Sequence, residues 1–394
     1  MREAVIVAAA RTPVGRAKTG SLRDTRPEDL LATVIAEVCN RTPDLNKKDV
    51  DDVVIGCAGP AGEHGVNMAR VTALHAGMPD TVPGHTVSRA CSSGLQAIAI
   101  GAQSVMCGFA DVVIAGGVGS MSCMRIGGSN PSAHAGILEQ RPEVYTSMGI
   151  AAENVAARFN VDRRDMDGFA VGSHRKALEA IDEGRFRDEI VPVKARVYPL
   201  DPTDRSGPEE ILFDTDECPG ASLEELAALE PAFDPSGSVT ARNSSAPGDG
   251  AAAVVLASRE SAQRLDIKPM ATFRCYAAAG VPPEVTGTGP TVAVPKLTRV
   301  SGMDLEDFGL VELDEASACQ AVHCIRQLGL NEEMVNVNGG AIALGRPLGS
   351  TGAMLAVTIL HEMARRKVRY GLVTMSAEGG MGLAAAFELE DHEG

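Results

Sequence analysis

A single cysteine, Cys91, directly precedes a segment whose apolar residues have helical spacing, 95–108. The first backbone N–H groups of a helix lack partners within the helix, and that end carries a partial positive charge. Both features favour the thiolate, which is the nucleophilic form of cysteine. Cys91 is therefore a candidate nucleophile, although a free cysteine is also commonly just a small buried hydrophobic residue.

Two glycine-rich segments, 338–352 and 378–382, provide a second kind of candidate site. Glycine lets backbone N–H groups approach an oxyanion or a phosphate closely, but it also serves tight turns between core strands. Neither segment has the spacing of a Walker or dinucleotide-binding motif. The pair Asp314-Glu315 follows a strand-like run, where it is either an acid/base pair or an ordinary helix N-cap.

Strand-like and helix-like segments alternate along the chain, which predicts an α/β fold. The same order recurs in both halves, which indicates a duplicated α/β unit. The middle of the chain, about 120–246, is loop-rich and reads as an insertion into the first half. We expect strands at 4–10, 53–56, 112–117, 248–258, 310–313 and 372–375, and helices at 27–40, 95–108, 151–159, 164–183 and 350–363.

Composition excludes several function classes. The 394 residues carry a net charge of −16, which argues against nucleic acid or an anionic membrane as a partner. The nine cysteines are scattered without metal-ligand spacing, so we expect no metal site and reduced thiols in the cytoplasm. No apolar stretch approaches the roughly 18 residues of a membrane span. A small anionic ligand remains compatible with this charge.

These residues together resemble the thiolase family, the coenzyme A-dependent enzymes that make or cleave β-ketoacyl thioesters. The resemblance covers nearly the whole chain. Four further segments match the family's opening, its loop domain and its glycine loop, namely 11–15, 148–155, 184–192 and 336–345. Residues 88–94 resemble the family's nucleophile motif.

The resemblance implies a five-layer αβαβα core made of two duplicated βαβαβαββ halves, with an inserted loop domain. The N-terminal half is expected at 1–120 plus 247–268, the inserted domain at 121–246, and the C-terminal half at 269–394. It also implies a homodimer or a dimer of dimers. Coenzyme A and acyl-CoA enter as substrates, and no covalently bound cofactor is expected.

The family's catalytic residues carry over only in part. Cys91 matches the nucleophile that takes the acyl group. Arg346 stands where the family has a histidine, Ser376 stands where it has a second cysteine, and Glu378 stands where it has a glycine. Asp314 replaces the asparagine of an Asn-Glu-Ala-Phe motif. Arginine is always charged and cannot be a general base, so Glu378 or Asp314 is expected to move protons.

The coenzyme A side of the site is expected to involve four residues. Ser245 matches a family serine, and Met148 lies in the matched loop-domain segment. Ser147 stands where the family has a histidine, and Arg242 stands where it has a glycine. Arg242 is also one of the few cations available for the phosphates of coenzyme A.

Three functions fit these replacements. The first is an active thiolase-type acyltransferase that forms an acyl-enzyme on Cys91 and forms or cleaves a β-ketoacyl-CoA. The second is a non-catalytic or partner-dependent subunit that binds CoA thioesters and needs a second, different chain. The third is an aldolase- or lyase-like enzyme that cleaves carbon–carbon bonds on the same fold. The shortened segment 124–145 favours a bulky or non-acetyl acyl group.

Overall fold

The computed structural model describes residues 2–124, 132–201, 203–218 and 220–390. Residues 125–131, which belong to the segment expected to cover the acyl pocket, lie outside the described residues. The predicted strands and helices are all present, and the helix expected at 27–40 has those bounds in the structure.

The first half follows the expected βαβαβαββ order. The apolar runs that predicted strands are buried along their whole length in β1, β5 and β8, as expected for strands covered on both faces. The elements of this half are β1 (Ala4–Arg11), β2 (Gly15–Arg16), α1 (Pro27–Asn40), β3 (Asp52–Cys57), α2 (Met68–His75), β4 (Gly84–Val87), α3 (Ser93–Met106), β5 (Val112–Ser120) and β8 (Gly248–Ser258).

The second half repeats this order after the short helix α8 (Arg259–Arg264). Its elements are β9 (Ala271–Gly280), η4 (Pro283–Thr288), α9 (Pro290–Ser301), β10 (Leu310–Leu313), α10 (Ala318–Leu328), η6 (Glu332–Met334), α11 (Ala341–Leu344), α12 (Thr351–Arg366), β11 (Tyr370–Ala377) and β12 (Met381–Leu389).

The third strand of the second half departs from the expected pattern. Its place is taken by an isolated parallel bridge between Val311 and Val335. The next residue, Asn336, has a left-handed backbone with φ of +45°, which ends extended structure. Its side chain bonds both the N–H and the C=O of Leu313 at 2.8 Å, so side-chain bonds replace the ladder of a strand.

The strands of the two halves form one continuous ten-stranded mixed sheet in the order β10-β11-β12-β9-β1-β8-β5-β3-β4, with β2 beside β8. The two halves meet where β1 and β9 pair over only two residue pairs. In each half the parallel pairings lie toward the outer end of the sheet, β3 with β4 and β5 in the first and β10 with β11 in the second. The matched pairings support the duplication expected from the sequence.

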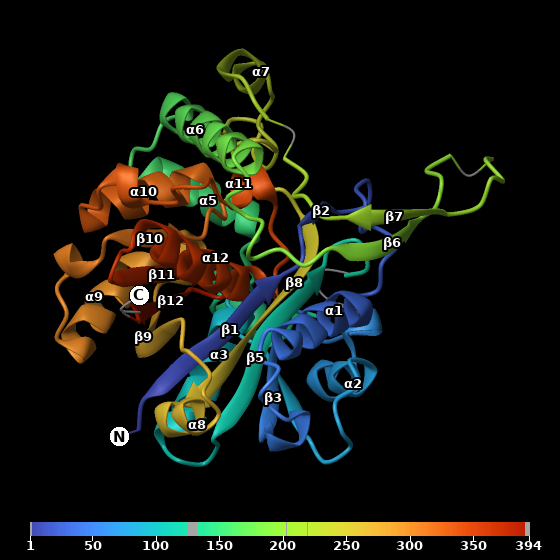
Figure 1. Cartoon of the computed structure of the whole chain (residues 1–394). Helices are drawn as coiled ribbons and strands as arrows, with labels where there is room; N and C mark the ends of the chain where they lie inside the picture. The colour runs from blue at the N-terminus through green and yellow to red at the C-terminus, as the bar shows by residue number, and fades with distance from the viewer. Residues whose placement is uncertain (1, 125–131, 202, 219, 391–394) are drawn as a thin grey trace.

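The apolar core forms separate clusters between the helices and the strands, whose arrangement is drawn in Figure 1. One cluster lies between α1, α2 and the first half's strands, and another lies between α9, α10 and the second half's strands. The central cluster joins α3 and α12, which lie between the strands of both halves. This arrangement confirms the fold class and brings the starts of the two duplicated helices together.

The starts of α3 and α12 pack through glycine. A Cβ at Gly94 would lie 2.9 Å from the backbone N of Ala353 and the backbone O of Gly349. A Cβ at Gly352 would lie 2.7 Å from the Cβ of Leu95. The duplicated Ser/Thr-Gly segments of the sequence thus allow the two helix starts to approach closely.

We expect Gly94→Ala to lower the free energy of unfolding by about 1–3 kcal/mol, because the new methyl group meets backbone that cannot move aside alone. Gly168→Ala is the matched control, since a Cβ there meets nothing within 4 Å in the interior of a helix. It should stabilise the protein by about 0.5–1 kcal/mol. Urea unfolding of both variants measures the contrast, and an equal effect of the two would contradict this packing.

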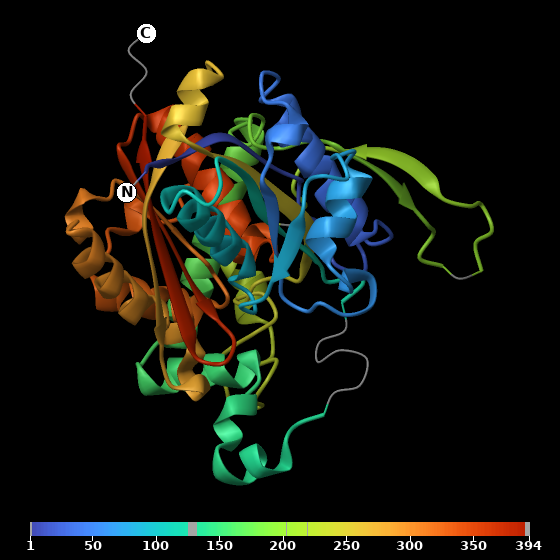
Figure 2. The same cartoon turned by 90° about the horizontal axis from the view of Figure 1, so that it is seen from below.

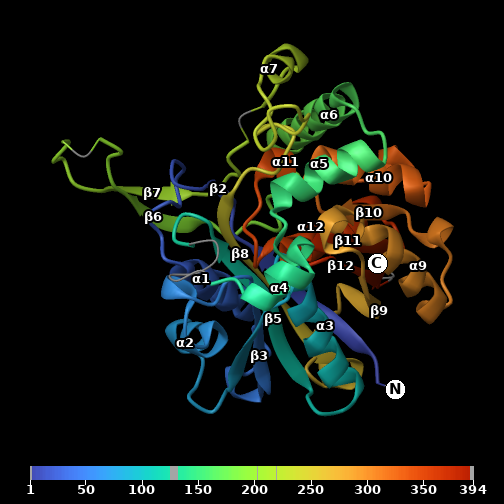
Figure 3. The same cartoon turned by 180° about the vertical axis from the view of Figure 1, so that it is seen from behind.

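The region between β5 and β8 contains α4 (Ala135–Gln140), α5 (Met148–Arg158), α6 (Arg163–Asp182), β6 (Val193–Val197), β7 (Glu209–Phe213) and α7 (Leu223–Ala227). Helices α5 and α6 pack on α10, and the β6–β7 hairpin reaches away from the body of the molecule (Figure 1, Figure 2 and Figure 3). The domain limits at 120 and 247 stay a prediction. Among the described residues, no helix is long and apolar enough to cross a membrane.

Candidate active site

Cys91 lies immediately before Ser92, the N-cap residue of α3, and only 2% of its surface is exposed. The turn before it is tight. Ala90 has a left-handed backbone with φ of +47°, and the N–H of Ser93 donates to the C=O of Ala90 at 3.2 Å. A non-glycine residue in this region is unusual and is held in place by its surroundings. The turn keeps the thiol at the positive end of α3.

Arg346 approaches Cys91 from the second half of the chain. It follows Gly345, whose φ of +97° lies in a region that L side chains rarely adopt. The backbone N–H of Arg346 donates to the C=O of Ala246 at 2.8 Å, which anchors this turn. The glycine-rich segment thus redirects the chain and points a buried guanidinium at the cysteine.

A buried carboxylate holds this guanidinium from behind. Arg346 Nε donates to Asp314 Oδ1 at 2.9 Å, and its Nη2 donates to Asp314 Oδ2. Burial opposes the charged form of Arg346, but the charge of Asp314 and the charge and hydrogen bonding of Cys91 outweigh it and raise its pKa. Arg346 therefore stays charged at every accessible pH. The arrangement can stabilise negative charge on the Cys91 sulfur and on a group bound to it.

Cys91 and Arg346 line a cavity of about 460 Å³. It brings together six of the residues predicted from the sequence. They come from the starts of α3 and α5, from the segment before β8, and from the loops after α11 and β11. The six are Cys91, Ser147, Met148, Ser245, Arg346 and Glu378. Besides Arg346, two of them have defined hydrogen bonds: the N–H of Ile150 donates to Ser147 Oγ at 3.4 Å, which caps α5, and Ser245 Oγ donates to Ala316 O at 3.2 Å.

Three predicted residues do not line this cavity. Asp314 lies behind Arg346 and is fully buried. Both of its carboxylate oxygens accept hydrogen bonds from Arg346. Ser376 is fully buried within β11, and its Oγ has no hydrogen-bond partner in the described part of the chain. Arg242 lines a neighbouring cavity of about 60 Å³ and donates to Gly220 O.

The helix-cap interpretation of Asp314-Glu315 is wrong. The N-cap of α10 is Ser317, and Asp314 bonds Arg346 instead. The Glu315 carboxylate accepts hydrogen bonds from Ser173 Oγ at 2.7 Å, Asn336 Nδ2 at 2.7 Å and Ile342 N at 3.1 Å. Burial raises its pKa against these bonds. Both carboxylates therefore fix the segment that leads to Arg346.

Several residues of the site carry no signal in the sequence. Thr286 Oγ1 donates to Ala377 O at 2.6 Å and accepts from Gly380 N at 3.1 Å, so it holds the loop that presents Glu378. It comes from η4, about 90 positions earlier in the chain, and no local pattern connects the two. Phe233 and Gln320 also line the cavity. Ser244 lines it too, and its Oγ has no hydrogen-bond partner among the described residues; only its place beside Ser245 pointed to it.

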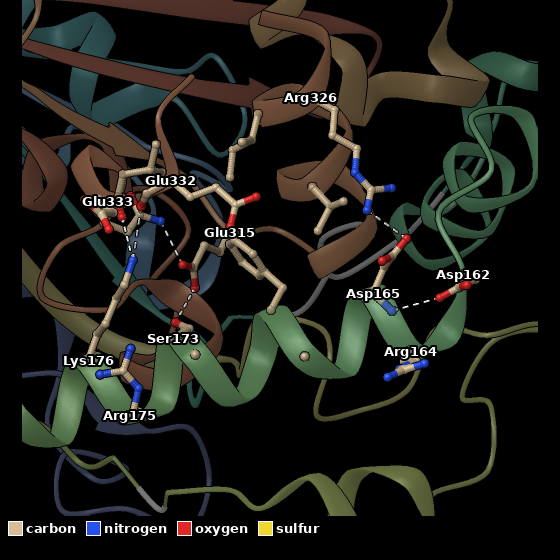
Figure 4. Close-up of a pocket in the computed structure, with 17 residues that line it drawn as sticks. Asp162, Arg164, Asp165, Ser173, Arg175, Lys176, Glu315, Arg326, Glu332 and Glu333 are labelled. Atoms are coloured by element: carbon tan, nitrogen blue, oxygen red, sulfur yellow. Dashed lines mark hydrogen bonds and ion pairs between the residues drawn. The ribbon is translucent and has the colours of Figure 1, made fainter. Parts of the chain in front are cut away.

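A larger cavity of about 680 Å³ lies between α6, α10 and η6 (Figure 4). It is lined by side chains of both charges, with the buried Glu315 and Ser173 at one wall and Lys176 beside them. Burial lowers the pKa of Lys176, whose Nζ donates to Val335 O at 2.9 Å. No cysteine or histidine is among its lining residues as described. We therefore place the chemistry in the smaller cavity, which holds a nucleophile and a fixed cation.

Nothing in the described ranges gathers three or more His, Cys, Asp or Glu side chains in a way that could hold a metal ion. Comparison with known families then decides what kind of protein contains this cavity. The model of the thiolase N-terminal domain matches residues 4–260, and that of the thiolase C-terminal domain matches residues 267–389.

The chain belongs to the thiolase family. It is 49% identical over 391 residues to the 3-ketoacyl-CoA thiolase of Bacillus subtilis (strain 168), which covers 99% of this chain and 100% of that protein. It is 44% identical over 392 residues to the peroxisomal 3-ketoacyl-CoA thiolase 1 of Arabidopsis thaliana, covering 98% of this chain and 87% of that one. The crystal structure of the Bacillus anthracis acetyl-CoA acetyltransferase superposes with a TM-score of 0.88 at 37% identity, covering 99% of both chains.

The two thiolase domains meet within the short segment between β8 and β9, which is where the duplicated halves join. The cavity is shared between them. Cys91, Ser147 and Ser245 come from the thiolase N-terminal domain, and Arg346 and Glu378 come from the thiolase C-terminal domain. The site therefore exists only when both halves are folded together.

Proposed function

We propose that this thiolase-family chain is an acyl-CoA C-acyltransferase that forms or thiolytically cleaves a β-ketoacyl-CoA through an acyl-enzyme on Cys91. The observation that carries the proposal is the placement of a buried thiol at the start of α3, beside the fixed cation of Arg346, in one cavity. The names of the relatives, 3-ketoacyl-CoA thiolase and acetyl-CoA acetyltransferase, support the same reaction class.

The first step is transfer of the acyl group to the enzyme. The Cys91 thiolate attacks the thioester carbonyl, a new C–S bond forms, and the bond to coenzyme A breaks as its thiolate leaves. Negative charge moves from the sulfur through the carbonyl oxygen to the departing sulfur, so no net proton transfer is needed. Arg346 and the start of α3 favour this charge along the path.

The second step makes the carbon–carbon bond and requires a base. Glu378 removes a proton from the α-carbon of a second acyl-CoA, the resulting carbanion attacks the Cys91 thioester, and the Cys91 thiolate is released. Thiolysis runs the same steps backwards. We assign the base to Glu378 because, besides Cys91 and Arg346, it is the one ionisable residue among the described residues that line the cavity.

This assignment makes the active site atypical for a thiolase. Arg346 stands where the family has its histidine, and Ser376 stands where it has its second cysteine. Neither residue accepts a proton near neutral pH. The lost base is thus replaced by a carboxylate, and the lost hydrogen-bonding imidazole is replaced by a permanent cation.

The acyl substrate is proposed to be larger than acetyl. Ser317 stands where the family motif has phenylalanine, and it lines the cavity together with apolar side chains such as Met121, Phe233 and Leu348. The small side chain leaves room beside Cys91. We assign Ser147, Met148 and Ser245 to binding of the coenzyme A arm, and Arg242 to binding of its phosphates.

We also propose that the protein is a homodimer or a dimer of dimers and is located in the cytoplasm.

A partner-dependent subunit is the second candidate function. It is favoured by the observation that no histidine and no second cysteine lines the cavity among the described residues. Such a chain would bind the CoA thioester and leave part of the chemistry to another protein.

Intact-mass analysis after incubation with a panel of acyl-CoA thioesters tests the main proposal. We expect an added mass equal to the acyl group, absent in Cys91→Ser and kept in Cys107→Ser, which changes an exposed cysteine. Condensed or cleaved β-ketoacyl-CoA should appear in the same reactions. An adduct without any product would favour the partner-dependent subunit, and no adduct with any thioester would overturn the acyl-enzyme.

A further inference from the structure

We propose that Asp314 is a positioning residue that fixes the Arg346 guanidinium beside Cys91, so that the two act as one unit in acyl transfer. The inference rests on the proposed function, in which Cys91 carries the acyl group. It assigns to Asp314 neither a base nor a substrate contact. The evidence is the placement of the two side chains relative to the cavity.

The Arg346 guanidinium contacts Asp314 along one edge, and Arg346 also lines the cavity. Its Nε and Nη2 both donate to Asp314, which is the two-bond geometry that a planar guanidinium and a carboxylate prefer. The residue also lines the cavity and interacts with Cys91, whereas Asp314 does not line it. The carboxylate therefore occupies one edge of the guanidinium and leaves its remaining N–H groups for the cavity.

Asp314 is itself held rigidly. It directly follows β10, and its backbone N–H donates to Thr374 O of β11 at 3.0 Å. It is fully buried, and Arg346 is 5% exposed. A carboxylate fixed to a strand end in this way leaves the arginine little freedom to rotate, whereas an arginine in water samples many rotamers.

The pair also solves an electrostatic problem. A lone buried guanidinium would be costly, but a buried pair with good geometry offsets that cost. The pair is neutral as a whole and presents its positive end to Cys91. Because both Asp314 oxygens are engaged by Arg346, the carboxylate is not available to remove a substrate proton.

Four variants test the unit: Asp314→Asn, Arg346→Lys, these two combined, and Asp314→Asn combined with Arg346→His. Arg346→Lys keeps a cation but loses the planar two-bond geometry. Asp29→Asn, which alters an exposed partner of His75, is the matched control. Two rates are measured from pH 5.5 to 8.5, alkylation of Cys91 by iodoacetamide and acylation of Cys91 by the best thioester.

We expect Asp314→Asn and Arg346→Lys each to slow acylation by about 10- to 100-fold, with KM for the thioester changed less than about threefold, because orientation is lost while binding is kept. Their effects should not multiply in the combined variant Asp314→Asn with Arg346→Lys. The wild type should lack a transition caused by an imidazole, and the variant with Arg346→His should acquire one near pH 6.5.

Unchanged acylation in Asp314→Asn, or effects that multiply, would overturn the proposal. Thermal melts identify a variant that fails to fold, and Arg346→Lys, which removes no charge, then decides alone. Alkylation needs no thioester. If Asp314→Asn and Arg346→Lys each slow alkylation of Cys91 and their effects do not multiply, while no thioester acylates Cys91, the proposed function fails and the positioning role stands.

Discussion

Glu378→Gln is expected to lower the rate of carbon–carbon bond formation and cleavage by about 10²- to 10⁴-fold, while Cys91 is still acylated. The amide has nearly the shape of the carboxylate but accepts no proton, so only the step that needs a base should suffer. Acylation exchanges one thiolate for another and needs no base. Steady-state rates of β-ketoacyl-CoA cleavage, together with the rate of adduct formation by mass spectrometry, measure the two steps separately.

Glu306→Gln is the matched control, because it changes an exposed glutamate that does not line the cavity. It should leave both steps unchanged. If Glu378→Gln slows neither step, the base is another group or is supplied by another chain, and the partner-dependent subunit becomes the better interpretation. If it slows both steps equally, Glu378 acts in binding and not as a base.

Cys91 and the buried strands show what a local sequence pattern can predict. Cys91 was identifiable because its own neighbours dictate its setting: glycine at the third position beyond it, then an apolar helix. The same holds for the buried strands, whose continuous apolar runs are visible in sequence. These features depend on contacts within about a dozen residues.

The pairing of Asp314 with Arg346 was not identifiable in this way. The two residues are 32 positions apart, and both were named as candidates without their mutual contact. Whether a carboxylate faces a cavity or an arginine is decided by packing, and only the structure shows that Asp314 is covered and Glu378 is not. The third strand of the second half was lost for a similar reason, since the bonds of Asn336 to Leu313 form only in the fold.

The largest effect on stability is expected for Arg11→Ala, which should lower the free energy of unfolding by about 3–5 kcal/mol. Arg11 ends β1 and is 3% exposed. Its Nε donates to Glu189 Oε1 at 2.6 Å, and its Nη1 and Nη2 donate to the two oxygens of Asp216 at 2.8 Å each. Removal of the guanidinium leaves two buried carboxylates without their counter-charge.

The position of the Arg11, Glu189 and Asp216 cluster explains why loss of the Arg11 guanidinium should also disturb the candidate active site. Glu189 and Asp216 belong to the region between β5 and β8, and Asp216 Oδ1 also accepts from the backbone N–H of Val14 at 2.7 Å. Val14 in turn packs on Gly345, the residue before Arg346. A Cβ added at Gly345 would lie 3.0 Å from Val14 Cγ1. Arg11 therefore ties the region between β5 and β8 to β1 and supports the turn that carries Arg346.

Urea unfolding followed by circular dichroism measures the effect of Arg11→Ala on the transition midpoint. Arg26→Ala is the matched control: it breaks the pair with Glu28, in which the Arg26 side chain is 57% exposed, and should cost less than about 1 kcal/mol. The ion pairs of Arg11 are buried, whereas that of Arg26 is partly exposed. A similar loss of unfolding free energy in both variants would therefore contradict the role of Arg11. A loss in Arg11→Ala with unchanged Cys91 acylation at low temperature would confine that role to stability and remove its link to Arg346.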